Sequence, residues 1–163
     1  MKIIQANITQ LPIIAALAYA IWPSAYGEIL SVEQLKYMLE KFYSLEALTE
    51  QLEQRSHVFL LAEENGIFVG YASYELNIEG NKTKVHKIYV LPETQGKGFG
   101  VQLLNEMENK AKEAQNKILF LNVNRFNKAQ HFYKKLGFEI AYEEDIKIGN
   151  DYLMEDFVME KKI

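Results

Sequence analysis

Residues 85–100 read Val85-His86-Lys87-Ile88-Tyr89-Val90-Leu91-Pro92-Glu93-Thr94-Gln95-Gly96-Lys97-Gly98-Phe99-Gly100, and this stretch decides the fold. Up to Leu91, apolar residues occupy both alternating faces, with Lys87 as the exception, which is typical of a strand covered on both sides. Pro92 ends the strand, because proline has no N–H to donate to a sheet. After three glycines at alternate positions, apolar residues take helical spacing at Val101, Leu103, Leu104, Met107 and Ala111. The stretch therefore predicts a strand, a turn, a glycine loop and a helix.

The glycine loop predicts a site for a phosphate group. The first N–H groups of a helix lack carbonyl partners and lie at the positive end of its dipole, and glycine lets a ligand approach them. The spacing excludes two familiar nucleotide motifs. A dinucleotide fingerprint counted from Gly96 would need glycine in place of Val101, and a P-loop would need Ser or Thr after Lys97.

The rest of the chain predicts a mixed α/β sheet in one domain, residues 1–163. Thr9, Ser31 and Ser44 are expected to cap three helices, the first of which should end at Trp22-Pro23. Two further helices are expected at 101–114 and 128–136. Strands are expected at 2–6, 57–62, 67–74, 85–91, 118–123, 138–142 and 157–159, with 118–123 buried on both faces.

A second motif lies in the expected helix 128–136, at Ala129-Gln130-His131-Phe132-Tyr133-Lys134-Lys135-Leu136-Gly137-Phe138. It resembles the pattern Ala-x-x-Phe-Tyr-x-x-x-Gly-Phe of the GNAT superfamily of N-acetyltransferases. The run Gln95-Gly96-Lys97-Gly98-Phe99-Gly100 likewise resembles the loop Gln-x-x-Gly-x-Gly that binds the acetyl-CoA pyrophosphate in that family. The resemblance implies a GNAT-like, mainly antiparallel sheet flanked by helices. For the loop taken alone, a glycine-rich turn with only a structural role is the alternative.

The resemblance also implies a cofactor site, with acetyl-CoA as co-substrate and no metal. The residues expected to bind acetyl-CoA are Ile88, Tyr89, Val90, Gln95, Gly96, Lys97, Gly98, Phe99, Gly100, Asn122 and Asn127. Asn127 stands two residues before Ala129, where many family members have asparagine three before. Asn122 and Asn124 therefore compete for that role, and Asn127 also fits a helix cap.

Two residues are candidates for proton transfer. Tyr133 matches the family tyrosine that lies near the CoA sulfur and protonates the departing thiolate; otherwise it is an aromatic residue beside the core. His86 lies on the strand beside the cofactor, and an imidazole can accept a proton near neutral pH. The alternatives for His86 are a half-buried histidine with a hydrogen-bond partner, or deprotonation of the amine through water.

Composition restricts the partners. The 163 residues carry a net charge of −4, so neither nucleic acid nor an anionic membrane is an expected partner. The absence of cysteine excludes a disulfide framework and a cysteine acyl-enzyme, and suits a cytoplasmic protein. The apolar run from Leu11 to Ile21 is too short to span a bilayer and lacks the flanks of a secretory signal.

The predicted function is direct transfer of an acetyl group from acetyl-CoA to a primary amine in a ternary complex. Diffuse similarity at Tyr26 to Leu52 and after Asp145 resembles the bacterial spermidine/spermine N-acetyltransferase branch, which favours a polyamine or other small amine. An aromatic and acidic pocket for a polycation would be lined by Trp22, Tyr26, Glu28, Tyr74 and Glu75. The alternatives are acetylation of a protein N-terminus or lysine, and a non-catalytic acyl-CoA-binding module. The resemblance also makes a homodimer an expectation.

Overall fold

The computed structural model describes all 163 residues. Its elements in chain order are β1 (Lys2–Gln5), the 3₁₀ helix η1 (Ile8–Gln10), α1 (Leu11–Tyr26), α2 (Val32–Tyr43), α3 (Leu45–Glu53), β2 (Val58–Glu64), β3 (Ile67–Ile78), β4 (Lys82–Val90), the 3₁₀ helix η2 (Pro92–Thr94), α4 (Phe99–Glu113), β5 (Ile118–Asn124), α5 (Ala129–Lys135), β6 (Glu139–Gly149) and β7 (Tyr152–Lys162). The order of strands and helices along the chain agrees with the prediction.

All seven strands form one sheet in the order β1-β2-β3-β4-β5-β7-β6. Neighbouring strands are antiparallel, with the exception of β4 and β5, which run parallel. A parallel pair needs a crossover connection, and α4 provides it. The prediction of a mixed, mainly antiparallel sheet flanked by helices is thereby confirmed.

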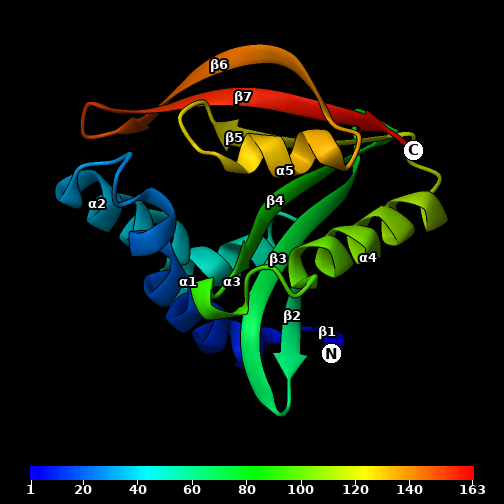
Figure 1. The fold of residues 1–163 in the computed structure, drawn as a ribbon, viewed down its shortest axis with the longest axis horizontal. Helices are drawn as coiled ribbons and strands as arrows, with labels where there is room; N and C mark the ends of the chain where they lie inside the picture. The colour runs from blue at the N-terminus through cyan, green and yellow to red at the C-terminus, as the bar shows by residue number, and fades with distance from the viewer.

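The two faces of the sheet are covered by different helices (Figure 1). One core cluster joins the sheet to α4 and α5 through residues such as Leu103, Met107 and Tyr133. The other joins it to α1, α2 and α3 through residues such as Ile14, Met38 and Leu48. Residues that alternate along a central strand therefore belong to two separate cores.

Helix α1 differs from its prediction at both ends. Asn7, not Thr9, is the capping residue, and it caps the 3₁₀ helix η1 that leads into α1, since its Oδ1 accepts a hydrogen bond of 3.0 Å from the Thr9 N–H. Pro23 does not end the helix, which continues to Tyr26. By length and composition, the helical segment Ile8–Tyr26 could cross a membrane. In the fold one side of it is packed against α2, α3 and the sheet, with Leu11, Ile14, Leu17, Ala18, Ile21 and Trp22 buried.

The two other helix caps are confirmed. Ser31 Oγ accepts a hydrogen bond of 3.1 Å from the Gln34 N–H, and Ser44 Oγ accepts one of 3.1 Å from the Ala47 N–H. Each serine satisfies an N–H that has no intrahelical partner. These caps fix where α2 and α3 begin below the sheet.

A β-bulge in β4 breaks the predicted alternation of its side chains. Ser73 of β3 pairs with Lys87 and Tyr74 pairs with Val85, so His86 is an extra residue on β4. As a result His86 and Lys87, although consecutive, both line the cavity on the α1–α3 side of the sheet. A bulge redirects side chains in this way because two residues on one strand face one residue on the other.

Strand β5 is not buried on both faces, contrary to the prediction. Leu119, Leu121 and Val123 are buried, whereas the residues between them are partly exposed. Asn122 and Asn124, on the second face, line the cavity. The polar positions of β5 therefore belong to a site and not to a core.

Candidate active site

The glycine loop leaves a row of backbone donors free at the start of α4. Gly96 and Gly98 have φ angles of +82° and +86°, and no atom lies within 4 Å of where a Cβ would stand. The first backbone hydrogen bond of α4 runs from the Gln102 N–H to the Gly98 carbonyl, so the N–H groups of residues 96–101 have no carbonyl partner. This loop fits a pyrophosphate, because it combines N–H groups without carbonyl partners and exposed glycines at the positive end of a 15-residue helix.

Some of the remaining loop residues are exposed to a ligand, and others are packed in the core. Gln95 and Lys97 are exposed, and Lys97 Nζ lies 3.6 Å from Glu64 Oε1. Phe99 is buried against the α4 core, so only its backbone N–H faces the loop. Gly100 lies against the aromatic ring of Phe132. A Cβ atom at this position would be 3.4 Å from the Cζ atom of that ring. The cofactor roles of these residues stay predictions.

Strands β4 and β5 separate beyond the bulge. Their pairing ends at Val85 and Leu121, although β4 continues to Val90 and β5 to Asn124. The Leu91 N–H donates to the Val69 carbonyl at 2.8 Å, which turns that residue's backbone toward β3. Because peptide groups alternate along a strand, those of Ile88 and Val90 face the gap without a strand partner.

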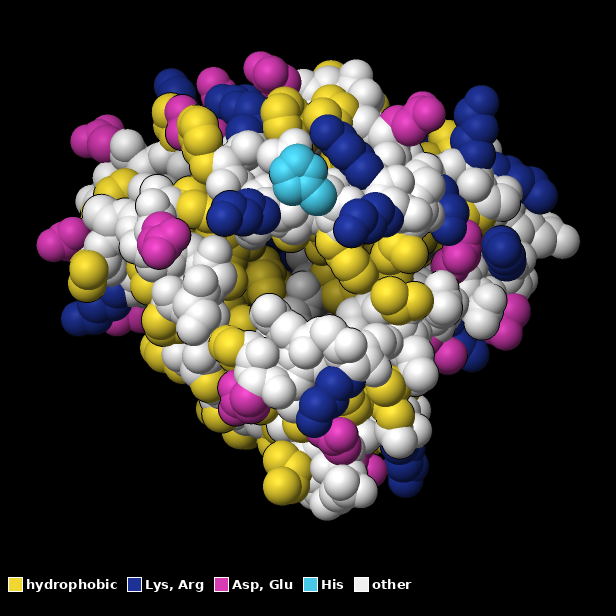
Figure 2. Space-filling view, viewed as in Figure 1, with side chains coloured by type: hydrophobic (Ala, Val, Ile, Leu, Met, Phe, Trp, Pro, Cys, Tyr) yellow, Lys and Arg dark blue, Asp and Glu magenta, His cyan; other side chains and the backbone are white.

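This gap fits the pantetheine arm of CoA, whose amides need strand-like partners. Tyr89 is also predicted to contact the cofactor. Its side chain lies on the α1–α3 side of the sheet, where it lines the cavity. Figure 2 shows a hollow in the face viewed in Figure 1, walled by hydrophobic side chains and rimmed by Lys and Arg side chains. Cations at the rim suit a ligand that carries several phosphates.

Tyr133 lies on α5, packed between Phe132 and Phe138 with ring centroids at 5.3 and 5.8 Å. Burial and the nearby Tyr26 hydroxyl raise the pKa of Tyr133 well above its ordinary value. The hydroxyls of Tyr26 and Tyr89 share a hydrogen bond of 2.7 Å. Tyr133 also contributes to the raised pKa of Tyr89, so the three hydroxyls lie in one region. A hydroxyl that keeps its proton at neutral pH meets the first requirement of a general acid.

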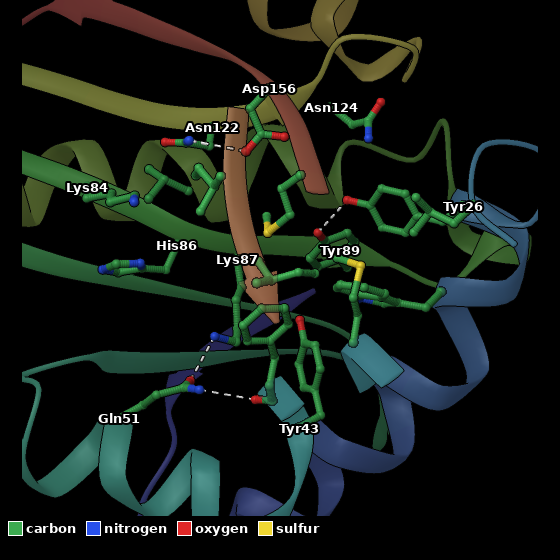
Figure 3. Close-up of a pocket in the computed structure, with 18 of the residues that line it drawn as sticks. Tyr26, Tyr43, Gln51, Lys84, His86, Lys87, Tyr89, Asn122, Asn124 and Asp156 are labelled. Carbon is green, nitrogen blue, oxygen red and sulfur yellow. Dashed lines mark hydrogen bonds between the residues drawn. The ribbon is translucent and has the colours of Figure 1, made fainter. Parts of the chain in front are cut away.

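A cavity of about 450 Å³ opens on the α1–α3 side of the sheet. It is bounded by α1, α2 and α3, by β4 and β5, and by the β6–β7 hairpin (Figure 3). In Figure 3, Asp156, Asn122 and Asn124 lie on the upper wall, and Lys87, Tyr43 and Gln51 on the lower one. The 22 lining residues include Asp156 as their only carboxylate.

Asp156 belongs to β7 and is 2% exposed. The Asn122 Nδ2 donates to Asp156 Oδ2 at 3.2 Å and to Glu144 Oε2 at 3.1 Å. Burial raises the pKa of Asp156, and the nearby Glu144 adds to that shift. Asn122 therefore holds two carboxylates of the hairpin in place, while its cofactor role stays a prediction.

His86 has a partner on the neighbouring strand. Its Nε2 lies 2.9 Å from Glu75 Oε1, and its ring stacks on His57 with centroids 3.9 Å apart. Burial, His57 and the charges of Lys84, Lys87 and Arg55 hold the pKa of His86 well below its ordinary value. A neutral ring that donates from Nε2 to Glu75 keeps Nδ1 as an acceptor. In Figure 3 the ring points away from the Tyr26–Tyr89 pair, so the predicted role as base stays a prediction.

The ligand atoms of His57, Glu75 and His86 lie within 4.8 Å of one another, a spacing that could hold a metal ion. Burial lowers the pKa of His57 to about 4, and the charges of Lys87, Arg55 and Lys84 add to the shift. These positive charges also disfavour a cation at this place. The expectation that no metal takes part stays a prediction.

Lys87 is the second buried charge of the cavity. Its Nζ donates to Gln51 Oε1 at 2.8 Å and lies 5.4 and 5.7 Å from the ring centroids of Tyr43 and Phe59. Burial lowers the pKa of Lys87 to about 7, and the charge of Lys84 contributes to the shift. Lys87 is thus an amine that is easily switched between its charged and neutral forms.

The predicted polycation pocket is only partly correct. Trp22 and Tyr26 line the cavity. Glu28 is exposed outside it, and Tyr74 belongs to the core on the opposite face. Glu75 lies beneath the cavity wall, bound to His86. The acidic side chains that were to attract a polycation are therefore not gathered there.

Asn124 and Asn127 hold local turns. Asn127 Oδ1 accepts a hydrogen bond of 2.9 Å from the Ala129 N–H, which supports the alternative of a helix cap. Asn124 Oδ1 accepts one of 2.9 Å from the Phe126 N–H. The side-chain oxygen of each is thus occupied before any cofactor contact.

Sequence reasoning missed Asp156, Gln51 and the role of Lys87. Two signals were available. Lys87 interrupts an apolar strand face, and Asp156 shares a strand face with the buried Val158. A charged residue at a core-facing position needs a partner or a function.

Comparison with known proteins shows which proteins this chain is similar to. A family model described as an acetyltransferase (GNAT) domain matches residues 28–154. A spermidine N(1)-acetyltransferase of Thermoplasma acidophilum is 28% identical over 165 residues, 99% of this chain and 96% of the relative. The Escherichia coli L-amino acid N-acyltransferase MnaT is 34% identical over 86 residues, half of each chain. The crystal structure of PaiA N-acetyltransferase from T. acidophilum with coenzyme A superposes with a TM-score of 0.82 at 28% identity, covering 99% of this chain and 98% of that one.

Proposed function

Because this chain belongs to the GNAT family of acetyltransferases, we propose that it moves the acetyl group of acetyl-CoA directly to a primary amine of a small molecule. The coarser activity, acetyl-CoA-dependent N-acetyl transfer, follows from the family and from the full-length relatives. The observation that carries the proposal is the separation of β4 from β5 beyond Val85 and Leu121. The gap would take the arm of acetyl-CoA, and residues of the same two strands line the cavity that would hold the amine.

Residues of the glycine loop, of β4 and of α5 would bind acetyl-CoA and assist the transfer of its acetyl group. The free N–H groups of residues 96–101 would hold the pyrophosphate, and the peptide groups of Ile88 and Val90 would pair with the arm. A backbone N–H that faces the gap would polarise the thioester carbonyl. Tyr133 would donate its proton to the departing sulfur.

Residues on the acceptor side bind the amine. The Asp156 carboxylate, beside the Tyr26 hydroxyl, would receive the amine as its ammonium form. The amine must lose a proton before it attacks, and a water molecule would accept it, with the Nδ1 of His86 as the alternative acceptor. Direct attack needs no acyl-enzyme, which agrees with a chain without cysteine.

A polyamine is one candidate acceptor, because a full-length relative is a spermidine acetyltransferase. An amino acid is a second, because the relative over half of the chain acts on L-amino acids. We further propose that the protein is a single domain that acts in the cytoplasm, with a homodimer as the expected assembly.

Release of free CoA thiol tests the proposal. Purified protein is incubated with acetyl-CoA and, in turn, with polyamines, amino acids, simple alkylamines and short peptides. The protein has no cysteine of its own, so the thiol signal reports product alone. We expect turnover with at least one small amine. Turnover with peptides alone would favour the protein-acetyltransferase alternative, and binding of acetyl-CoA without any turnover would favour the non-catalytic module.

A further inference from the structure

The charges around the acceptor cavity are mainly positive. Arg55, Lys84 and Lys87 line it, and Asp156 is the only acidic residue that does. Two other carboxylates, those of Glu75 and Glu144, do not line the cavity and are hydrogen-bonded to His86 and Asn122. Arg55 is paired with Glu50 at 3.3 Å, so Lys84 and Lys87 stand against Asp156 among the remaining charged residues of the lining. A polycation placed here would meet two like charges and one opposite charge at the wall.

Lys87 is a buried cation without a counter-ion. The side chain is 9% exposed, and no carboxylate oxygen lies within 4.0 Å of its Nζ. Its one hydrogen-bond partner is the neutral Gln51 side chain, whose Nε2 in turn donates to the Phe42 carbonyl at 3.1 Å. An ammonium group has three donors, so two remain for a ligand. A buried charge of this kind is costly until an anion pairs with it.

Asp156 and Lys87 lie on opposite walls of the cavity (Figure 3). Asp156 comes from β7 and lies near the Tyr26 hydroxyl, whereas Lys87 comes from the bulge of β4 and lies over the Tyr43 ring. A negative group and a positive group that face one cavity from two sides match a ligand with both charges. The ammonium group of such a ligand would lie on the Asp156 side and its anionic group on the Lys87 side.

Part of the remaining wall is apolar. It is formed by Met38, Phe42, Ile146, Ile148, Leu153 and Met154. Apolar walls with a few placed polar groups are the usual composition of a small-molecule site. They suit a ligand that carries a hydrocarbon side chain beside its charged groups.

From these observations we propose that the acceptor is an amine that also carries a carboxylate and an apolar side chain, with Lys87 as the residue that binds the carboxylate. The chemical class is that of apolar α-amino acids. The inference rests on the proposed function, since it names the acceptor of that same reaction, and it selects against spermidine and spermine.

Matched pairs of acceptors test it. Leucine, methionine and phenylalanine are each compared with the amine left when the carboxylate is removed, and with the corresponding amino-acid amide. The measured quantity is kcat/KM from CoA release at saturating acetyl-CoA. A charge-assisted contact to the carboxylate should favour each acid about 10- to 100-fold over its decarboxylated amine. Spermidine serves as the polycation in the same panel.

Two lysine variants test whether Lys87 causes the preference for the acid over the decarboxylated amine. Lys87→Met keeps the length of the side chain and removes its charge, and should bring the ratio of acid to amine close to one. Lys112→Met is the control, because Lys112 is an exposed residue of α4 that pairs with Glu108 and does not line the cavity. That variant should keep the wild-type ratio. The wild-type ratios decide the question even if the Lys87 variant does not fold.

Three results would overturn the inference: decarboxylated amines or amides used as well as the acids, spermidine preferred over every acid, or an unchanged ratio in a folded Lys87→Met variant. In each of these the enzyme still acetylates a small amine, so the proposed function survives. If acetyl-CoA binds and no amine is acetylated, both the proposed function and this inference fail.

Discussion

Tyr133 has a packing role and a chemical role that one substitution separates. Its ring contacts Phe132 and Phe138 in the core beneath α5, while its hydroxyl lies near those of Tyr26 and Tyr89. Phenylalanine keeps the ring contacts and removes only the hydroxyl. The side chain is 8% exposed, so a replacement of different shape would disturb the core instead.

Tyr133→Phe should lower kcat by about 10²- to 10⁴-fold, the range typical for loss of a positioned proton donor. Binding of acetyl-CoA, measured by calorimetry, and the melting temperature should stay near the wild-type values. Tyr142→Phe is the matched control, because Tyr142 is an exposed residue of β6 that does not line the cavity. Equal turnover in the two variants would remove Tyr133 from the mechanism.

Lys87 makes stability depend on pH. Its pKa falls from 10.5 in the unfolded chain to about 7 in the fold, mainly through burial. Below pH 7 both states carry the proton and the burial of the charge is fully unfavourable. Between about pH 7 and pH 10.5 the unfolded chain holds a proton that the folded one has lost, so this penalty shrinks as pH rises, by up to about 1.4 kcal/mol per pH unit.

Lys87→Met should therefore stabilise the protein most at pH 6, and its advantage over the wild type should shrink toward pH 10. Urea unfolding at pH 6, 8 and 10 gives the free energies to compare. Lys112→Met, on the exposed side of α4, should show no such trend. A Lys87→Met variant less stable than the wild type at pH 6 would mean that the ammonium is stabilised in the fold.

At the scale of elements, the junction between β4 and α4 forms the cofactor site. The strand supplies Ile88 and Val90 with free peptide groups, and the loop supplies the uncapped N–H groups of the helix. Gly98 stands at the N-cap of α4 with φ +86° and no atom near its missing Cβ. A methyl group there would project into the space that the phosphates would occupy.

Gly98→Ala should raise the KM for acetyl-CoA about tenfold and lower stability by about 1 kcal/mol, since alanine is strained at positive φ. Gly80→Ala is matched for strain, because Gly80 has φ +92°, has equally open surroundings and lies in the β3–β4 turn. It should lose similar stability in urea unfolding and keep the KM. If both variants keep the KM, the loop has only the structural role.

Two local irregularities place the acceptor side. Helix α1 continues one turn past the residue where Pro23 was expected to end it, and this turn carries Tyr26 to its hydrogen bond with Tyr89. The missing proline N–H leaves one helical bond unmade on an exposed side, a cost that packing of Trp22 against the sheet outweighs. The bulge at His86 then turns two consecutive basic residues toward the same cavity.

At the scale of the whole molecule, the cavity joins parts of the chain that are far apart. Gln51 of α3 binds Lys87 of β4, and Asn122 of β5 binds Asp156 of β7. Tyr37 of α2 donates to the Ile148 carbonyl of β6 at 2.8 Å, which ties the helices to the hairpin over the cavity. The acceptor site therefore forms only where the helices α2 and α3, the strands β4 and β5 and the β6–β7 hairpin meet. The charged residues that face the site come from these separate parts of the chain.

The sequence by itself determined the order of the elements, the mixed sheet, the helix caps at Ser31 and Ser44 and the family, because each rests on local patterns. Periodicity, capping and glycine spacing act within a few residues, and the two GNAT motifs are short. Only the tertiary structure decided the bulge at His86, the extension of α1 past Pro23 and the charges that face the acceptor. These depend on contacts between residues distant in sequence, where the free energy of packing overrides local preference.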